Sequence, residues 1–246
     1  MGETTLIYLS RVMALHRKLE TLAQNVANAE TTGFRAHQLS FHEYLKSEKG
    51  FGDSGKKERP SSLVAPHLQT VSYSQGSLQA TGNPLDVGID GEGYLVIQTD
   101  AGERYTRNGS LTVNGDGRLA TLDGQLVLGK NGPISVPANE GQITIAFDGT
   151  ISSAKAVLGQ LRLVRFENPH ALQSVGSGLL SSNEPPSDAA PISARIISGF
   201  LEKSNMDITR EMANLSEIVR SYEMVARLLQ KSQDADDINK LGSVPD

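Results

Sequence analysis

The sequence predicts an α+β protein in which long N- and C-terminal helices pair as a coiled coil and flank a central antiparallel β-rich domain. Three observations support this prediction. Apolar residues recur at intervals of three and four near both ends of the 246-residue chain. Asp-Gly and Asn-Gly dipeptides, which favour tight turns, are dense in the middle. A charged, glycine-rich stretch separates the first helical pattern from that middle.

The N-terminal helix is predicted over residues 6–29, which contain neither Gly nor Pro. Its apolar side chains follow a heptad-type spacing, which is typical of a helix that packs against another helix. Thr31, Thr32 and Gly33 are expected to end it, because β-branched residues disfavour a helix and glycine readily adopts a left-handed conformation. The apolar stripe consists of Tyr8, Val12, Leu15, Leu19, Leu22, Val26 and Ala29.

Residues 46–62 are charged, rich in Gly and poor in aliphatic side chains, so a flexible linker or exposed loop is predicted there. The expected domain boundaries follow from this linker and from the two helical patterns. They place the N-terminal helix and the segment after it in 1–45, the linker in 46–75, the central β domain in 76–199 and the C-terminal helix in 200–246.

The central region alternates short strand-like runs with turn dipeptides. In 142–147 the apolar residues Ile143, Ile145 and Phe147 occupy alternate positions, the period of two expected for a half-buried strand. Residues 134–136 are a further short run of this kind. Turn signals at intervals of about 8–12 residues predict an antiparallel sandwich or barrel-like domain.

The C-terminal helix is predicted from a second stripe, whose members are three or four residues apart. Asn205 and Asp207 precede this stripe and are expected to cap the N-terminus of the helix. Two such stripes at opposite ends of the chain favour terminal helices that pair with each other or with further copies. The alternative is that each helix packs on the core of its own domain. The second stripe consists of Ile208, Met212, Leu215, Val219, Tyr222, Ala226 and Leu229.

The composition excludes several classes of function. The chain has 23 Lys and Arg and 28 Asp and Glu residues, a net charge of −5, which argues against a nucleic-acid-binding protein. Without Cys it has no disulfide, thiolate zinc site or cysteine nucleophile. Its apolar runs are far shorter than the roughly 20 residues of a membrane span, so no membrane insertion is expected. Charged residues near the N-terminus argue against a cleaved signal peptide.

No motif predicts a catalytic, cofactor or metal site. Two P-loop-like stretches, 50–57 and 124–131, lack the Ser or Thr that would ligate magnesium. The stretch beginning at Asn114 resembles the start of a calcium loop, but Arg118 occupies a ligand position. The five His lack metal-ligand spacing. We therefore expect no enzymatic activity, no cofactor and no metal.

Three motifs carry a resemblance to a known family. Residues 25–35 (NVANAETTGFR) resemble the N-terminal signature of the flagellar rod and hook proteins. Residues 199–207 (GFLEKSNMD) are similar to the C-terminal signature of that family. Residues 81–94 (TGNPLDVGIDGEGY) and 105–109 (YTRNG) are similar to strings of its central domain. The resemblance covers nearly the whole chain, apart mainly from the predicted linker.

Length and one further string narrow the resemblance within the family. The shortest rod members lack a β domain, and hook proteins carry a further outer domain for which 246 residues leave no room. Residues 125–137 (QLVLGKNGPISVP) are most like the proximal-rod member, with the distal-rod member as the alternative. The resemblance implies a structural subunit of the bacterial flagellar basal-body rod, a hollow shaft that transmits torque. In this family the terminal helices form a coiled coil that lines a central channel.

The resemblance also implies partners and a location. The partners are proximal and distal rod proteins, further copies of the chain itself and the flagellar type III export apparatus. Neither nucleic acid nor a membrane is expected. The protein is expected in the periplasmic part of the basal body, after export without a cleaved signal peptide. Its assembly contacts are expected at Val12, Leu15, Leu19, Leu22, Val26, Met212, Leu215, Val219, Tyr222 and Leu229.

A periplasmic peptidoglycan hydrolase that works beside the rod is the alternative from another class. It would need a group of carboxylates or a metal in a cleft of the β domain. Asp86 and Asp90 are a candidate acid–base pair, although carboxylates beside turn glycines more often stabilise the turn. A secreted glycan-binding β module is a third alternative. This chain lacks the Trp residues on which sugars commonly stack in such modules.

Overall fold

The computed structural model describes residues 3–46, 61–137, 141–189 and 194–241. These residues form two compact units. The first, called here the helical unit, takes its described residues from 1–27, 37–70 and 207–246. The second, called the β body, consists of residues 28–36 and 71–206. The chain therefore passes between the two units four times.

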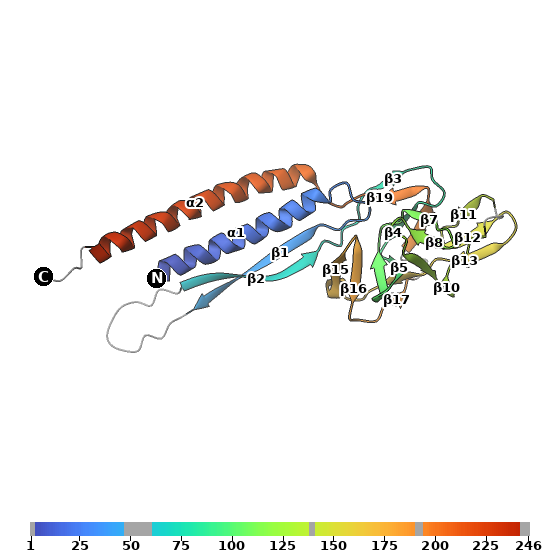
Figure 1. The fold of residues 1–246 in the computed structure, drawn as a ribbon, viewed down its shortest axis with the longest axis horizontal. Helices are drawn as coiled ribbons and strands as arrows, with labels where there is room; N and C mark the ends of the chain where they lie inside the picture. The colour runs from blue at the N-terminus through green and yellow to red at the C-terminus, as the bar shows by residue number, and fades with distance from the viewer. Residues whose placement is uncertain (1–2, 47–60, 138–140, 190–193, 242–246) are drawn as a thin grey trace. The chain divides into compact units, whose positions relative to one another are not determined.

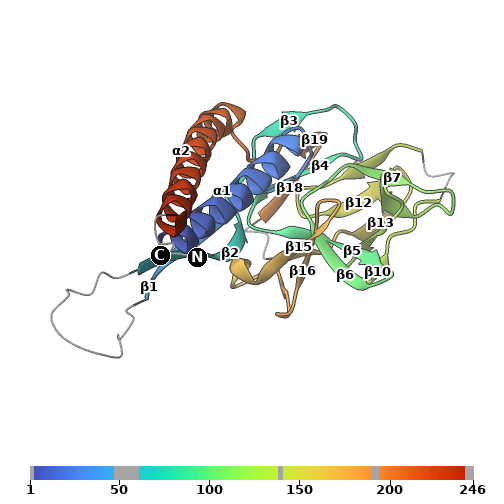
Figure 2. The same ribbon diagram turned by 60° about the vertical axis from the view of Figure 1, so that its left-hand side comes forward.

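The helical unit contains two long helices and a two-stranded antiparallel hairpin. Helix α1 (Glu3–Ala27) and helix α2 (Ile208–Leu241) lie side by side and run in opposite directions (Figure 1, Figure 2). Strands β1 (His37–Lys46) and β2 (Ser61–Val71) pair with each other, and β1 also contacts α1. The amide side chain of Asn25 joins helix to hairpin: it donates to the His37 carbonyl oxygen (2.9 Å) and accepts from the His37 N–H (2.8 Å).

The terminal helices are present and paired, but the prediction of a coiled coil is wrong. Among the helix residues whose burial the structure describes, Ala14, Leu22 and Asn25 on α1 and Ile218 on α2 are buried. Val219, which a heptad seam would bury, is 41% exposed. Adjacent residues of a helix are rotated by about 100° around its axis. The face that α2 turns towards α1 is therefore the one next to the predicted stripe. In addition, α1 packs on β1 as well as on α2, whereas a two-stranded coiled coil buries one seam only.

The predicted cap at Asp207 is confirmed, whereas α1 ends at Ala27, before the predicted end signal at Thr31, Thr32 and Gly33. Asp207 caps α2, because its Oδ1 accepts hydrogen bonds from the N–H groups of Thr209 (3.0 Å) and Arg210 (3.2 Å). Gly33 has the expected left-handed backbone, with φ of +68°. Asn205 does not cap the helix; its amide makes contacts within the β body that are described below.

The hairpin differs from the sequence expectation. Strand β2 lies within the range 46–75 that the sequence predicts to be a linker. Pro66 within this strand weakens the sequence signal, since proline is uncommon inside strands. Residues 47–60, which make up most of the charged, glycine-rich stretch 46–62, lie outside the described residues.

The β body is built from antiparallel strands in several small sheets and one large sheet. The large sheet has the order β15 (Leu172–Gly176), β16 (Leu179–Ser182), β6 (Gly102–Thr106), β5 (Tyr94–Thr99), β9 (Leu126–Gly129), β8 (Leu119–Thr121) and β7 (Leu111–Val113). Three further strands attach to it: β10 (Gly132–Pro133) to β9, β14 (Leu163–Arg165) to β5, and β17 (Ser187–Asp188) to β14. The 3-10 helix Pro169–Ala171 precedes β15.

Three smaller sheets complete this unit. They are β11 (Ile143–Ile145), β12 (Thr150–Ser153) and β13 (Val157–Gln160); β18 (Ala194–Ser198) with β4 (Val87–Gly91); and β19 (Phe200–Glu202) with β3 (Leu78–Ala80). The last two pairs bring the end of the β body next to its beginning, since Ile196 pairs with Ile89 and Leu201 with Gln79.

Strand β5 separates two hydrophobic clusters. Leu95 and Ile97 belong to one cluster, and Tyr94 and Val96 belong to the other. This alternation follows from the period of two along a strand that is buried on both faces. The predicted strand at 134–136 is not a regular strand, although Ile134 and Val136 are both buried in the first cluster.

Candidate functional site

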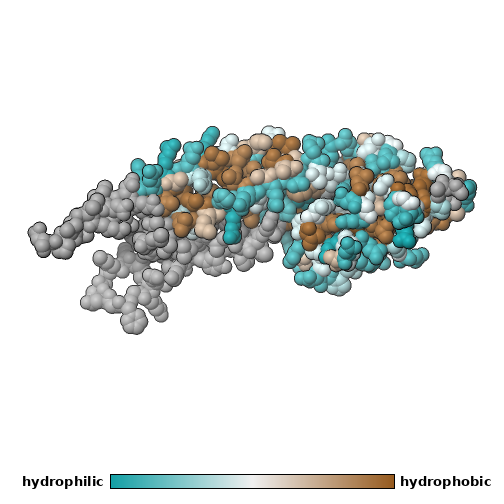
Figure 3. Space-filling view, viewed as in Figure 1, coloured by the Kyte–Doolittle hydropathy of each residue, from teal (hydrophilic) through white to brown (hydrophobic). Residues whose placement is uncertain are grey.

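The helical unit exposes apolar side chains along α2. Ile208, Met212, Val219 and Tyr222 are 41–45% exposed and are separated by four, seven and three residues. We call these four residues the outer stripe. Figure 3 shows apolar residues gathered over α1 and the first half of α2. An apolar row at this spacing on one helix is the pattern that a further helix would cover.

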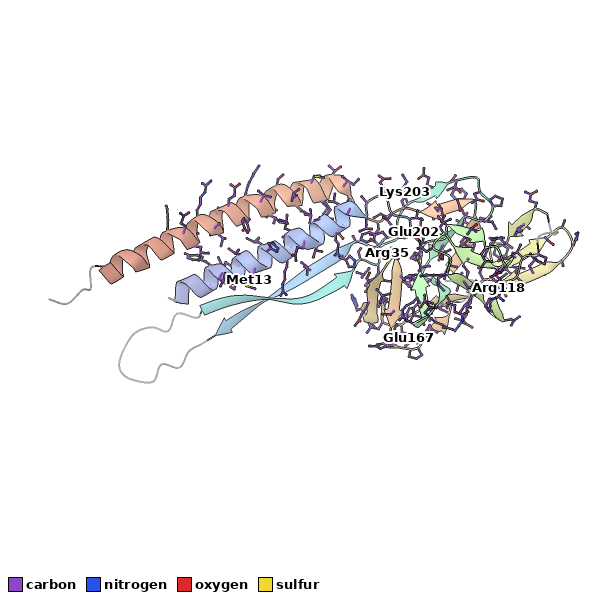
Figure 4. All side chains as sticks on the ribbon, viewed as in Figure 1. Met13, Arg35, Arg118, Glu167, Glu202 and Lys203 are labelled. Carbon is purple, nitrogen blue, oxygen red and sulfur yellow. The ribbon has the colours of Figure 1, made fainter. Side chains whose placement is uncertain are left out.

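The structure divides the residues that the sequence predicts as assembly contacts. Leu22 is buried within the helical unit, and Met212, Val219 and Tyr222 are exposed as members of the outer stripe. The others are partly buried: Val12, Leu15, Leu19, Val26, Leu215 and Leu229. Exposed apolar residues that the prediction omits include Leu9 and Met13 on α1 and Met224 and Leu228 on α2 (Met13 is labelled in Figure 4).

A second feature is a buried ionic cluster in the β body, formed by Arg35, Arg107 and Glu202. Glu202, the last residue of β19, is only 1% exposed. Its Oε2 accepts a hydrogen bond from Arg107 Nε at 2.5 Å, and its Oε1 lies 3.1 Å from the Arg35 guanidinium. The N–H of Gly76 donates to the same Oε1 at 2.8 Å. Figure 4 shows Arg35 and Glu202 close together.

Arg107 is fixed by the backbone of β4 and the turn after it. Its guanidinium donates to the carbonyl oxygens of Ile89 (2.8 Å), Gly91 (3.0 Å) and Gly93 (2.7 Å). It also lies 6.0 Å from the centre of the Tyr94 ring, within range of a cation–π interaction. Burial raises the pKa of Tyr94, and the nearby arginines act in the opposite direction.

Arg35 is held less firmly. Besides Glu202 it donates to the carbonyl oxygen of Tyr73, at 3.3 Å, and its Nε has no hydrogen-bond partner among the described residues. Burial, followed by the charge of Arg107, lowers the pKa of Arg35, whereas Glu202 raises it. Two guanidinium groups therefore share one carboxylate in a site that is closed to water.

Asp86 and Asp90, the candidate acid–base pair, lie in different surroundings. The Oδ1 of Asp86 accepts a hydrogen bond from the Asn83 side chain at 3.0 Å, whereas Asp90 is exposed at the far end of β4. Asn114 Oδ1 accepts from the N–H groups of Asp116 and Arg118, so the calcium-like stretch is a self-capped turn. Within the described residues no group of three or more His, Asp or Glu could hold a metal.

Two remaining expectations concern a nucleotide site and the membrane. In the P-loop-like stretch 124–131, Leu126–Gly129 is strand β9, and the stretch 50–57 lies outside the described residues. Among the described helices, neither α1 nor α2 is long and apolar enough to span a membrane.

The sequence did not point to the ionic cluster. Each of its three residues lies in one of the three motifs that carry the family resemblance: Arg35 in the first, Arg107 in the central strings and Glu202 in the last. Each motif contains more than one charged residue, and no spacing rule in the sequence pairs these three.

Three family models match the chain. "Flagella basal body rod protein" matches residues 7–35, "Flagellar hook protein FlgE/F/G D1 domain" matches 88–153, and "Flagellar basal body rod FlgEFG protein C-terminal" matches 197–240. Each matched range contains one residue of the ionic cluster: Arg35 lies in the first, Arg107 in the second and Glu202 in the third.

Curated relatives match over most of their length. The flagellar basal-body rod protein FlgF of Mesorhizobium japonicum is 32% identical, with 99% of each chain covered. FlgF of Caulobacter vibrioides is 33% identical, with 94% of each chain covered. The flagellar basal-body rod protein FlgG of Bacillus subtilis is 29% identical, over 92% of this chain and 93% of the relative.

Proposed function

The chain belongs to the flagellar basal-body rod protein family, and from this premise we propose that exposed apolar faces of its terminal helices join it to neighbouring rod subunits. It is a structural subunit of the FlgF type, since the FlgF relatives match at 32% and 33% identity and the FlgG relative at 29%. Its partners are other components of the flagellar rod.

The outer stripe is the observation that supports this contact surface. Met212, Val219 and Tyr222 each leave more than 40% of their surface in contact with water. Burying apolar surface contributes about 25 cal/mol per Å², so covering several such side chains stabilises an assembly. Leu9 and Met13 would add a second apolar edge on α1. We assign the remaining predicted contacts, such as Leu15 and Leu229, to the same role.

The finer points of location and organisation are part of the proposal. We place the subunit in the proximal rod, within the periplasm, after type III export. We retain the domain boundaries 1–45, 46–75, 76–199 and 200–246 as sequence-based proposals.

We assign no enzymatic activity to this protein. A muropeptide-release assay on the purified protein tests this assignment, because release of soluble fragments would favour the hydrolase alternative.

The contact surface is tested by introducing a charge into it. In a motile strain in which this chain replaces the resident rod subunit, Val219→Asp is expected to abolish swimming and to remove the protein from isolated basal bodies. Ala213→Asp is the matched control, because it places the same charge at an exposed position that is rotated by about 120° around α2 from Val219. If Val219→Asp assembles as well as Ala213→Asp, the outer stripe is not a subunit contact.

A further inference from the structure

Residues 28–36 are the short segment that connects α1 to β1 and belongs to the β body; we call it the strap. Within the β body, the strap contacts the C-terminal segment closely. The Gly33 N–H donates to the Glu202 carbonyl oxygen at 2.8 Å, and the Asn205 N–H donates to the Phe34 carbonyl oxygen at 3.3 Å. The Ala36 N–H donates to Asn205 Oδ1 at 2.8 Å. The strap is thus docked largely on residues that follow the rest of the β body in sequence.

The Asn205 side chain ties this docking to a third part of the chain. Its Nδ2 donates to the carbonyl oxygens of Ser72 (3.2 Å) and Ser74 (2.8 Å). The Ser72 N–H in turn donates to the Ala36 carbonyl oxygen at 2.7 Å. The strap therefore lies in a hydrogen-bonded network whose centre belongs to the C-terminal segment.

The charge of Glu202 determines whether Arg35, and with it the strap, stays in this network. Arg107 has three carbonyl partners in the β body and cannot leave without breaking them. Arg35 has Glu202 and one long bond to Tyr73, and it sits on the strap. If Glu202 lost its charge, two buried guanidinium groups would repel each other without compensation. The less firmly held group would leave for water, and the strap would leave with it.

We propose that Glu202 is a latch for the strap: its carboxylate makes docking of residues 28–36 depend on the C-terminal segment that carries β19. The body then holds the N-terminal segment only after β19 has paired with β3. Docking of the strap within the β body is thus controlled by residues near the other end of the chain. This coupling is a property of the isolated chain and does not depend on rod assembly.

Hydrogen exchange on the full-length protein tests the latch. In Glu202→Gln, which keeps the backbone carbonyl, we expect the amides of Gly33 and Ala36 to exchange about a hundredfold faster. The amides of Leu119 and Leu161, which bond to the Ile134 and Gly149 carbonyls within the body, should keep their wild-type rates. Unchanged strap rates would overturn the proposal. Loss of protection at all four amides would also overturn it, because Glu202 would then be a general stability determinant.

Two further variants separate charge repulsion from a simple loss of contact. The double variant Arg35→Gln/Glu202→Gln removes the repulsion, and we expect its Gly33 and Ala36 amides to regain about tenfold of the lost protection. No recovery would refute the latch mechanism. Glu103→Gln is the matched control, because it neutralises a carboxylate in an exposed ion pair with Arg162 (3.2 Å) and should leave the strap unchanged.

Discussion

Gly33→Ala is expected to destabilise the β body by much more than the same change at Gly82. Both glycines have left-handed backbones, with φ of +68° and +75°. A Cβ at Gly33 would lie 2.6 Å from the backbone of Arg107 and Asn108, whereas a Cβ at Gly82 would have no atom within 4 Å. Gly82→Ala is therefore a control that matches the backbone conformation and lacks the steric conflict.

The magnitudes follow from these two environments. A left-handed alanine costs about 1–2 kcal/mol, and the lower entropy of the unfolded chain returns about 0.4–1 kcal/mol, so Gly82→Ala should cost about 1 kcal/mol. At Gly33 the strap must also move away from the Arg107 backbone. This movement breaks the bond from the Gly33 N–H to Glu202, worth about 1 kcal/mol, and adds about 1–3 kcal/mol of packing strain. The expected total is about 3–5 kcal/mol.

Urea denaturation measures this difference. Near-ultraviolet circular dichroism reports on the buried Tyr94 and Tyr105 of the β body, and the free energy of unfolding follows by linear extrapolation. If the two variants differ by less than about 0.5 kcal/mol, close contact between the strap and the Arg107 backbone does not contribute to stability, and the reasoning fails.

Other predictions concern local hydrogen bonds. Asp207→Ala should cost about 1 kcal/mol in the helical unit, measured by thermal melting at 222 nm, because the N–H groups of Thr209 and Arg210 lose their acceptor, whereas Asp207→Asn should cost much less. Hydrogen bonds from the backbone N–H (2.9 Å) and hydroxyl (2.8 Å) of Thr150 lower the pKa of Asp148. Because the pKa of Asp148 is lower in the folded chain than in the unfolded chain, its ionised carboxylate stabilises the fold at pH values above the ordinary aspartate pKa. This stabilisation is lost as the pH falls through the pKa of the folded chain. Thr150→Val should move the pKa of Asp148 back towards its usual range in a carbon-13 NMR titration, and an unchanged pKa would show that the hydroxyl has no part in the shift.

The main elements of this fold were predictable because their signals are local. An uninterrupted apolar stripe predicted each terminal helix, and the cap at Asp207 and the left-handed Gly33 followed from side-chain and backbone preferences of single residues. Strand β5 was predictable from its run of apolar and β-branched residues, Tyr94 to Ile97. Strand β2 was missed because Pro66 and its polar neighbours hide the alternation.

The candidate sites were predictable only in part. The stripe on α2 contains Met212, Val219 and Tyr222, which the sequence assigned to assembly, but the same pattern led to an incorrect coiled coil. Apolar spacing defines the faces of a helix and does not say which neighbour covers each one. Ile218, which lies outside the predicted stripe, is buried at 3% exposure, and it is the one buried residue among positions 208–231 of α2.

By itself, the sequence determined the family, the terminal helices and the β-rich middle, since each depends on residues within a few turns or strands of one another. Only the tertiary structure decided that Arg35, Arg107 and Glu202 share one buried site. Glu202 lies 95 residues from Arg107, and their contact depends on the register between β19 and β3 and between β18 and β4. Charges buried in a protein interior must find partners there, and the partners available are set by how distant strands pair.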